Sequence, residues 1–346
     1  MRKLRGAAVL AAAAMLTASM GITGMADTNG AGENGSHLDG MVCMDGRVIS
    51  AENGRLHLNR RVEDGMTEVV VTLSEDTKIL DAVNGFPISV ENLDDGEAVR
   101  VYTGQAMTLS LPPITNGILV LADVPAGYYP CPGNMVLLKA DNHAAAVARM
   151  LEEAGCAYHW SWLPAKIGYD RYDEGMAVFS RAPITAAENL LLSQINDYNN
   201  WKTRRALGIC AGDVWYYAVH MGWWKDEEEP FADQWNALEA TAGAKPMAFL
   251  LGDFNSEADV RGEGYDLILR SGWQDTYRLA QQRDDGYTVV QAIDGWRDAP
   301  DAAAKKRIDQ IWCSQTVPVH SSRVVFGGKQ EPRVSDHAGV LIEVER

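Results

Sequence analysis

The sequence predicts an α+β protein in which a small all-β domain precedes a larger domain of mixed strands and helices. Residues 41–125 contain short alternating apolar runs between turn residues, which is the pattern of short strands. From residue 133 to residue 346, apolar strand-like runs alternate with segments of helical period. A chain of 346 residues has room for two domains, and its 47% hydrophobic and 23% charged residues are typical of a globular protein.

Residues 1–26 have the pattern of an export signal. A basic start, MRKLR, precedes an Ala-rich apolar stretch over residues 7–22, and Gly24-Met25-Ala26 forms a small-x-small cleavage site. An uncut membrane anchor is the alternative interpretation of this segment. Residues 27–40 are polar and rich in glycine, which predicts a flexible linker. We therefore expect a secreted or cell-surface protein that has no membrane contact beyond this segment.

The net charge argues against some binding partners, and the cysteine spacing argues against disulfide and zinc sites. A net charge of −16 and a sequence pI of about 4.8 argue against binding to nucleic acid or to anionic membranes. The five cysteines are scattered and odd in number, and none forms a CxxC pair. This spacing favours neither a disulfide framework nor a zinc site, so each cysteine is expected to be a small buried apolar residue.

The all-β prediction for residues 41–125 rests on one hairpin and several short strands. GRVISAENGRLHL has two alternating runs around Asn53-Gly54, a dipeptide typical of two-residue hairpin turns. TEVVVTLS, EAVRVYTG and GILVLADV follow as short apolar runs. Five or six short strands of this kind favour a small closed or half-closed barrel. We find no catalytic pattern here, because the acids of this region occur in turn contexts where solvated side chains are expected.

The character of the chain changes in the Pro- and Gly-rich stretch PAGYYPCP at residues 125–132. Residues 142–154 then have a helical period, with Ala, Val, Met and Leu on one face. Two further helices are predicted over residues 234–240 and 263–270. The predicted strands are residues 175–179, 214–219, 247–251, 308–312 and 340–344.

Five polar clusters lie at or beside the ends of these strands. An acid or an amide at the end of a buried strand is costly unless something polar is held there. Each cluster alone has a simpler interpretation, since GDFN is a common turn and a histidine after a strand is often a hydrogen-bonded structural residue. The clusters are Asp173-Glu174-Gly175, Val219-His220, Gly252-Asp253-Phe254-Asn255, Arg307-Ile308-Asp309 and Ser335-Asp336-His337.

Taken together and in this order, the clusters resemble the endonuclease/exonuclease/phosphatase superfamily, from about Leu137 to the end of the chain. The resemblance implies a deoxyribonuclease-I-like fold, an α/β/β/α sandwich of two packed sheets flanked by helices. Longer stretches are similar to the sugar-phosphate phosphatase branch typified by maltose 6'-phosphate phosphatase. They are VLLKADNHAAAVARMLEEAG, HWSWLPAKIGYDRYDEGMAVFSRAPI, VHMGWWKDEEEPFADQW, RGEGYDLILRSGWQDTY and TVVQAIDGWRDA.

The resemblance implies hydrolysis of a phosphoester by in-line attack of water. This reaction needs a base for the water, neutralisation of charge on the phosphate and help for the leaving oxygen. His337 is the expected base, since imidazole titrates near neutral pH, and Asp309 would hold its other nitrogen. Asp253 would orient the water, and Asn255 would donate to a phosphate oxygen.

The resemblance also implies groups for the leaving oxygen and for a metal. His220 would face the phosphate or the leaving oxygen, and Glu174 would orient His220. Asp336 and Asp253 are the expected metal ligands. Carboxylate and amide oxygens favour Mg²⁺ or Mn²⁺ over zinc.

Aromatic and basic side chains supply candidates for substrate binding. Trp223 and Trp224 are candidates for stacking on a sugar ring, with core packing as the alternative. Arg261 and Arg297 are candidates either for pairing with a substrate phosphate or for surface salt bridges. The expected partner is a small phosphorylated substrate of the sugar-phosphate class.

One part of the family pattern is missing from this sequence. The family's catalytic domain opens with a strand ending in Asn, a helix, and a strand ending in a Gln-Glu pair whose Glu is the principal metal ligand. A unit of this kind needs on the order of 30 residues. The resemblance begins only at about Leu137, and we find no such unit in the sequence before it. Loss of two core strands is expected to leave a sheet edge uncovered. Three explanations stay open: a natural fusion with an incomplete domain, two pieces joined by a gene-model error, or replacement of the missing groups by Asp123, Asp141 or Asn142.

These observations predict an exported, divalent-metal-dependent phosphoesterase nearest to sugar-phosphate phosphatases, impaired if nothing replaces the missing Glu. A non-catalytic surface or binding protein is the first alternative, favoured by the missing Glu and the added β domain. A nuclease or a sphingomyelinase-type phosphodiesterase of the same fold is the second. The net charge of −16 argues against the nuclease.

Overall fold

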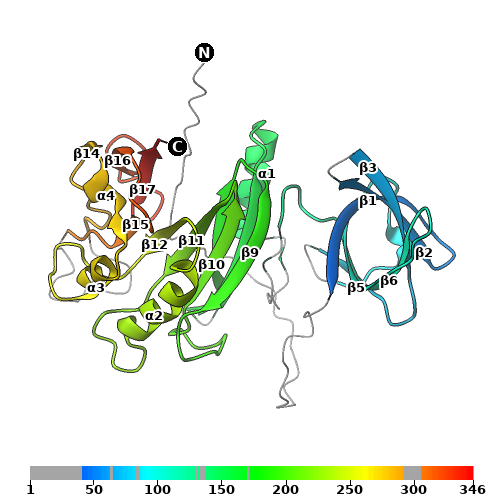
Figure 1. The fold of residues 1–346 in the computed structure, drawn as a ribbon, viewed down its shortest axis with the longest axis horizontal. Coiled ribbons are helices and arrows are strands. Elements are labelled where there is room, and N and C mark those ends of the chain that lie inside the picture. Colours follow the sequence, from blue (N-terminus) through cyan, green and yellow to red (C-terminus); the bar gives the residue numbers. More distant parts are fainter. Residues whose placement is uncertain are drawn as a thin grey trace. The chain divides into compact units, whose positions relative to one another are not determined.

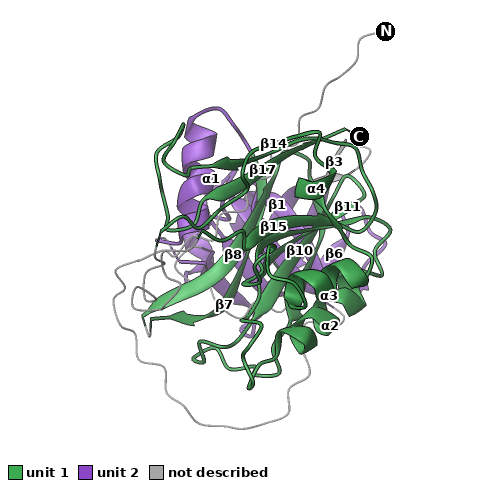
Figure 2. Ribbon diagram, turned by 90° about the vertical axis from the view of Figure 1, so that its left-hand side faces the viewer, with its two compact units in different colours: residues 1–21, 129–132, 158–346 green, residues 22–128, 133–157 purple. Residues whose placement is uncertain are grey.

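The computed structural model describes residues 41–62, 65–82, 86–129, 131, 138–139, 141–169, 171–291 and 305–345. The predicted export signal and linker, and Arg297, lie outside these residues. The chain divides into two compact units (Figure 2). Among the described residues, the first unit (purple, labelled unit 2 in Figure 2) lies within 41–128 and 138–157, and the second (green, labelled unit 1) contains 129, 131 and residues from 158 onward. No helix in the described part of the chain is long and apolar enough to cross a membrane.

The described part of the first unit is a closed barrel, which confirms the all-β prediction (Figure 1). Its sheet has the order β3-β2-β1-β5-β6-β4, and an additional parallel pairing of β3 with β6 closes the ring. The hairpin between β1 and β2 turns at Asn53 and Gly54, whose φ angles of 54° and 69° suit this dipeptide. The elements are β1 (Val42–Glu52), β2 (Arg55–Val62), β3 (Gly65–Thr72), β4 (Lys78–Asp81), the 3₁₀ helix η1 (Val90–Asn92), β5 (Ala98–Met107) and β6 (Ile114–Ala122).

The first unit also contains α1 (His143–Glu153). Asn142 is its N-cap, and the side-chain oxygen of Asn142 accepts from the backbone N–H of Ala145 at 3.1 Å. Capping therefore accounts for this residue. All five cysteines are free; Cys131 and Cys313 are buried as predicted, and Cys210 is partly buried. The prediction of burial is wrong for Cys43, the second residue of β1, and for Cys156, which follows the end of α1, because both are exposed.

The second unit is built on one large sheet with helices on one face (Figure 1). The sheet order is β13-β15-β12-β11-β10-β9 in the described residues. The buried residues of α2 are Phe231, Gln234, Trp235, Leu238 and Ala242, whose spacing places them on one helix face against the sheet. The elements are β9 (Ile184–Leu191), β10 (Arg205–Ala211), β11 (Val214–His220), α2 (Phe231–Ala242), β12 (Ala248–Asp253), α3 (Gly264–Arg270), β13 (Gln274–Asp275), α4 (Thr276–Leu279) and β15 (Asp309–Cys313).

The other face of the large sheet packs against a second layer of strands. Apolar residues from both layers form one core. The second layer contributes Leu163 and Val178 from one of its sheets, and Val340 and Ile342 from the other. The fold is thus an α+β sandwich with two packed layers of sheet, as the sequence predicts. The second layer contains β7 (His159–Gly168) and β8 (Tyr172–Ser180) in one sheet, and β14 (Gln282–Arg283), β16 (Val319–Val325) and β17 (Gly339–Val344) in another.

The second layer consists of two separate sheets in the described residues. Among the described residues, β8 pairs only with β7, and β17 pairs only with β16. Each of these strands therefore has one edge without a strand partner in that part of the chain. This arrangement agrees with the expectation that two absent strands would leave a sheet edge uncovered.

Candidate active site

Three neighbouring strands bring three of the predicted site residues into one row. His220 ends β11 and is the direct partner of Asp253, which ends the parallel strand β12. Asp253 is in turn the partner of Asp309, which begins the antiparallel strand β15. Direct cross-strand partners project to the same face of a sheet, so the three side chains lie side by side.

A glycine allows two of these strands to approach closely beside the row. Gly252 has φ 144°, and a Cβ atom there would lie 2.0 Å from the backbone oxygen of Val219. No other amino acid fits this position without moving one strand from the other. The glycine therefore helps to set the separation of His220 from Asp253.

Replacing Gly252 with alanine is expected to destabilise the protein by about 2 kcal/mol or more, because the new methyl group overlaps backbone. Urea unfolding measures this change. Gly327→Ala is the matched control, since its Cβ would make only ordinary contacts, at 3.5 Å and 3.7 Å. Equal stability of the two variants would contradict the argument.

His337 lies between β16 and β17, and its imidazole completes the centre of the site. The carboxylate of Asp309 accepts a hydrogen bond from Nδ1 of His337 at 2.9 Å, which leaves Nε2 for another partner. Burial opposes protonation of His337, but the hydrogen bond and charge of Asp309, with the charges of Asp253 and Asp336, raise its pKa to about 9. The imidazole is therefore held as a cation at neutral pH unless another positive charge offsets these carboxylates.

The carboxylate of Asp253 is almost fully buried and lies close to a second acid. Burial and the negative charge of Asp309 raise the pKa of Asp253 to about 7, against the attraction of His337. Its Oδ1 accepts from the backbone N–H of Asn255 at 2.8 Å, in a turn where Asn255 has φ 46°. The Nδ2 of Asn255 donates to the backbone oxygen of Met221 at 2.8 Å, so one amide hydrogen is used and the other is available.

His220 connects this centre to Glu174 on β8. Its Nε2 lies 3.6 Å from Oδ2 of Asp253, and its Nδ1 lies 3.5 Å from Oε1 of Glu174. Burial and the positive charges of Arg204 and Lys166 lower the pKa of His220 to about 4, against the attraction of Glu174. Burial opposes ionisation of Glu174, but His220, Lys166 and Arg204 outweigh it and lower the pKa of Glu174 to about 2. At neutral pH His220 is thus uncharged, and the two basic residues keep Glu174 ionised.

Lys166 and Arg204 are site residues that the sequence did not indicate. Lys166 is 4% exposed, and its Nζ donates to the backbone oxygen of Trp201 at 2.7 Å and lies 3.3 Å from Oε1 of Glu174. Arg204 is 6% exposed, and its buried Nε has no hydrogen-bond partner among the described residues. Neither residue belongs to a recognisable sequence motif. Lys and Arg are usually exposed, so nothing in the sequence indicated that they would be buried at the site.

The remaining predicted residues lie at the margin of this centre. Asp336 follows Ser335, whose hydroxyl lies 3.1 Å from Oδ1 of Asp336, and its charge acts on His337. Trp224 is partly buried and packs against the core, with its ring 5.8 Å from that of Phe231. Trp223 is half-buried, and no described contact assigns it to a substrate.

The chemistry of the donors fits a divalent cation. Asp253, Asp309 and His337 each offer one ligand atom, and these atoms lie within 4.8 Å of one another. Burial and the charge of Asp309 raise the pKa of Asp253 although the charges of His337 and Arg204 oppose this, and a cation would add to their compensation. The two carboxylates would hold the cation, because Nδ1 of His337 already donates to Asp309, and oxygen donors favour Mg²⁺ or Mn²⁺. The group contains Asp253 and Asp309, and Asp336 is not part of it.

The fold and this constellation define the class of protein. Residues 118–337, more than half of the chain, match the model of the Endonuclease/Exonuclease/phosphatase family, and the chain belongs to this family. Members of the superfamily generally use divalent metals. The match begins inside β6, a strand of the barrel, and therefore earlier than the resemblance read from the sequence.

The chain is also similar to solved structures, the first of which agrees with the fold. An endonuclease/exonuclease/phosphatase family protein from Leptotrichia buccalis C-1013-b is 29% identical, with a TM-score of 0.55, over 62% of this chain and 84% of that chain. A mannosyl-6-phosphatase of Bacteroides thetaiotaomicron VPI-5482 is 21% identical, with a TM-score of 0.40, over 58% and 90%. The 3' phosphatase NExo from Neisseria, bound to a product DNA hairpin, is 20% identical, with a TM-score of 0.42, over 60% and 86%. No curated protein matches the chain.

Proposed function

We propose that the second unit is a divalent-cation-dependent phosphoesterase that hydrolyses phosphomonoesters of sugars. The observation that carries this proposal is the Asp309–His337 pair beside the buried carboxylate of Asp253, in a chain of this family. The long sequence stretches that resemble sugar-phosphate phosphatases support the substrate class. The signal-like residues 1–26 support export of the protein.

His337 is the base in this proposal. Asp309 fixes Nδ1, so Nε2 is free to take a proton from the attacking water. A pKa of about 9 keeps His337 protonated while the neighbouring acids are uncompensated. A cation held by Asp253 and Asp309 supplies positive charge for these acids and for the phosphate when bound. His337 would then titrate closer to neutral pH, where its uncharged form accepts the proton.

Side chains on the other side of the row serve the phosphate and the leaving oxygen. The free amide hydrogen of Asn255 donates to a phosphate oxygen. Glu174, ionised and fixed, accepts from one ring nitrogen of His220, and its charge together with that of a bound phosphate favours the protonated imidazole, whose second N–H then donates to the leaving oxygen. The positive charges of Lys166 and Arg204 offset negative charge that develops on the phosphate in the transition state.

A non-catalytic binding protein is the second candidate, and one observation favours it. The second layer of the sandwich is divided among the described residues, as expected when the opening strand–helix–strand unit with its Glu is absent. In this case the same side chains would bind a phosphorylated ligand without turning it over.

Phosphate release with Mg²⁺ or Mn²⁺ from a panel of sugar phosphates separates these candidates. The panel includes a DNA hairpin with a 3' phosphate and a phosphodiester, because nucleic acid and diester substrates belong to the alternatives. Metal-dependent release from sugar phosphates supports the proposal. Release only from DNA or from the diester would replace the proposed substrate class, and a folded protein without any turnover would favour the binding protein.

A divalent cation is expected to stabilise the protein more strongly at about pH 8 than at about pH 5, because its ligands must be deprotonated. The folded-state pKa of Asp253 is raised from 3.8 to about 7, so its contribution to stability is present below 3.8 and is lost as pH rises through about 7. The pKa of His337 is raised from 6.5 to about 9, so its contribution is present below 6.5 and is lost as pH rises through about 9. Without cation, stability should therefore fall from mildly acidic to alkaline pH.

Thermal unfolding with and without Mg²⁺ or Mn²⁺ at the two pH values tests this prediction. At a concentration of about 100 times Kd, the cation should raise Tm by roughly 5 °C or more at the higher pH. Asp253→Asn should remove most of this rise, while Asp259→Asn, an exposed acid on the same loop, should retain it. A rise that is equal at both pH values, or that survives in Asp253→Asn, would place the cation elsewhere.

A further inference from the structure

The second unit has an open pocket of about 480 Å³ beside the candidate active site. This volume lies in the range of small-molecule sites. Its lining differs from the rest of this acidic chain, because arginine and tyrosine dominate it. The residues are Ala258, Asp259, Arg261, Tyr265, Tyr277, Arg278, Arg283, Asp285, Tyr287 and Arg307.

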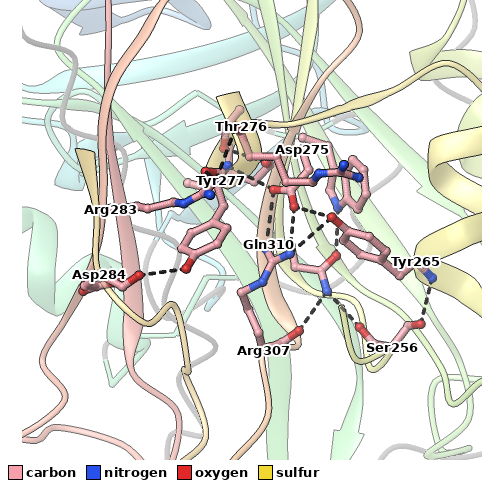
Figure 3. Close-up of polar contacts among 12 residues, drawn as sticks. Ser256, Tyr265, Asp275, Thr276, Tyr277, Arg283, Asp284, Arg307 and Gln310 are labelled. Carbon is pink, nitrogen blue, oxygen red and sulfur yellow. Dashed lines mark hydrogen bonds and ion pairs between the residues drawn. The ribbon is translucent and has the colours of Figure 1, made fainter. Parts of the chain in front are cut away.

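Arg307 forms the rigid part of this lining (Figure 3). It is 8% exposed, and its Nη2 donates to Oδ2 of Asp275 at 2.7 Å and to the hydroxyl of Tyr265 at 3.3 Å. Its guanidinium carbon lies 5.4 Å from the centre of the Tyr265 ring and 4.6 Å from that of Tyr277. The cation and both rings are therefore held in place before any ligand arrives.

Two further guanidinium groups at the pocket have no carboxylate partner in the described part of the chain. Arg283 donates to the backbone oxygens of Tyr277 and Arg278 at 3.2 Å and 3.4 Å, and lies 5.1 Å from the Tyr277 ring. Arg278 makes neither a hydrogen bond nor an ion pair there, and both arginines are exposed. Guanidinium groups with free donors favour a phosphate or a carboxylate, which they bind in a two-pronged manner.

The acids around the pocket leave these two arginines unpaired. Asp266 pairs with Arg261 at 2.6 Å, and Asp285 lies 3.5 Å from Lys329. Asp259 forms a hydrogen bond with Tyr287. The pocket thus has free positive charge in a chain whose net charge is −16.

The pocket continues from the segments that carry the catalytic acids. Arg307 is two residues before Asp309, and both side chains line one small cavity together with Tyr277. Ala258 follows Asp253 by five residues, and its backbone N–H donates to the oxygen of Arg307 at 3.1 Å. A ligand with one end at Asp253 and Asp309 therefore has its other end directed along these segments to the pocket.

We propose that this pocket binds a second anionic group of the substrate, so that the preferred substrate is a sugar that carries a phosphate or carboxylate besides the phosphate that is hydrolysed. This proposal rests on the proposed phosphoesterase function. Arg278 and Arg283 bind the second anion, and the partly buried ring of Tyr277, which Arg307 holds in place, contacts the sugar between the two anionic groups.

The kinetic test compares three substrates: a hexose bisphosphate, a phosphorylated sugar acid and a hexose monophosphate. In Arg278→Gln/Arg283→Gln, kcat/KM for the two substrates with a second anionic group should fall about 10-fold or more, while the value for the monophosphate changes less than about 2-fold. Arg270→Gln, an exposed arginine at the end of α3 that does not line the pocket, is the control and should leave all three values unchanged. Loss on only one of the two substrates with a second anionic group identifies which second group the pocket takes. Equal losses on all three substrates, or no loss, would overturn the proposal.

A binding test separates failure of this inference from failure of the proposed function. Calorimetric titration of the hexose bisphosphate and of the monophosphate into the His337→Ala protein measures affinity without turnover. Tighter binding of the bisphosphate, weakened about 10-fold or more by the two arginine replacements, supports the pocket even if the wild-type protein releases no phosphate. Equal affinities for the two sugars would reject the pocket even if the wild-type protein is an active phosphatase.

Discussion

Replacing His337 with alanine is expected to lower kcat for metal-dependent phosphate release by about 10²–10⁴-fold, the usual contribution of a positioned general base. The variant removes the imidazole whose Nδ1 is held by Asp309 at 2.9 Å, and no other described side chain makes this contact with Asp309. KM should change little, because the imidazole acts on the water rather than on the substrate. Steady-state kinetics on the best sugar phosphate of the panel measures both quantities.

The matched control is His320→Ala, a replacement of an exposed histidine on β16 of the same unit. It should leave kcat unchanged, and both variants should unfold cooperatively, so that a loss of activity cannot come from unfolding. Asp309→Asn should also lower kcat, since a neutral amide no longer favours the imidazole orientation in which Nδ1 donates. A His337→Ala protein that keeps wild-type turnover would remove His337 from the reaction.

Replacing Asp275 with asparagine is expected to destabilise the protein by about 3–5 kcal/mol, because Arg307 would keep a buried positive charge without its counter-charge. The side chain of Asp275 is 0% exposed and that of Arg307 is 9% exposed, and their closest contact is 2.7 Å. The hydroxyl of Tyr265 also donates to Asp275 at 2.5 Å, so the replacement weakens a second buried contact. Urea unfolding should show a lower midpoint with an unchanged slope.

Glu263→Gln is the comparison for an exposed pair. Glu263 lies 3.5 Å from Lys225, whose side chain is 85% exposed, and pairs of this kind contribute at most about 1 kcal/mol. If Asp275→Asn costs no more than this control, the network of Arg307, Asp275 and Tyr265 does not hold the pocket lining in place.

The sequence predicted site residues best where a polar side chain directly follows a run of apolar residues. The buried residues Ala248–Leu251 lead directly into Gly252 and Asp253, and that abrupt change located the strand end and the acid. The same reasoning found Asp309 and His337. It could not find Lys166 and Arg204, because their burial depends on neighbours far away in the chain.

Strands were missed where local composition opposes them. β7, HWSWLPAKIG, contains Pro164, a residue that argues against a paired strand, and the register with β8 is irregular between Pro164 and Lys166. β9, ITAAENLL, has alanine, asparagine and glutamate at its centre and forms a strand because β10 pairs along its whole length. The prediction of Asp336 as a metal ligand came from the resemblance to the superfamily, and sequence alone does not say which acids face each other.

The row of His220, Asp253 and Asp309 has a consequence for how this protein can diversify. Their separations follow from strand spacing of roughly 4.8 Å and from backbone register, not from the loops that follow each strand. Insertions, exchanges or losses in those loops can therefore alter which molecules are accepted while leaving the reactive groups in position. Proteins built on such a scaffold would be expected to share these three side chains and to differ in their ligands.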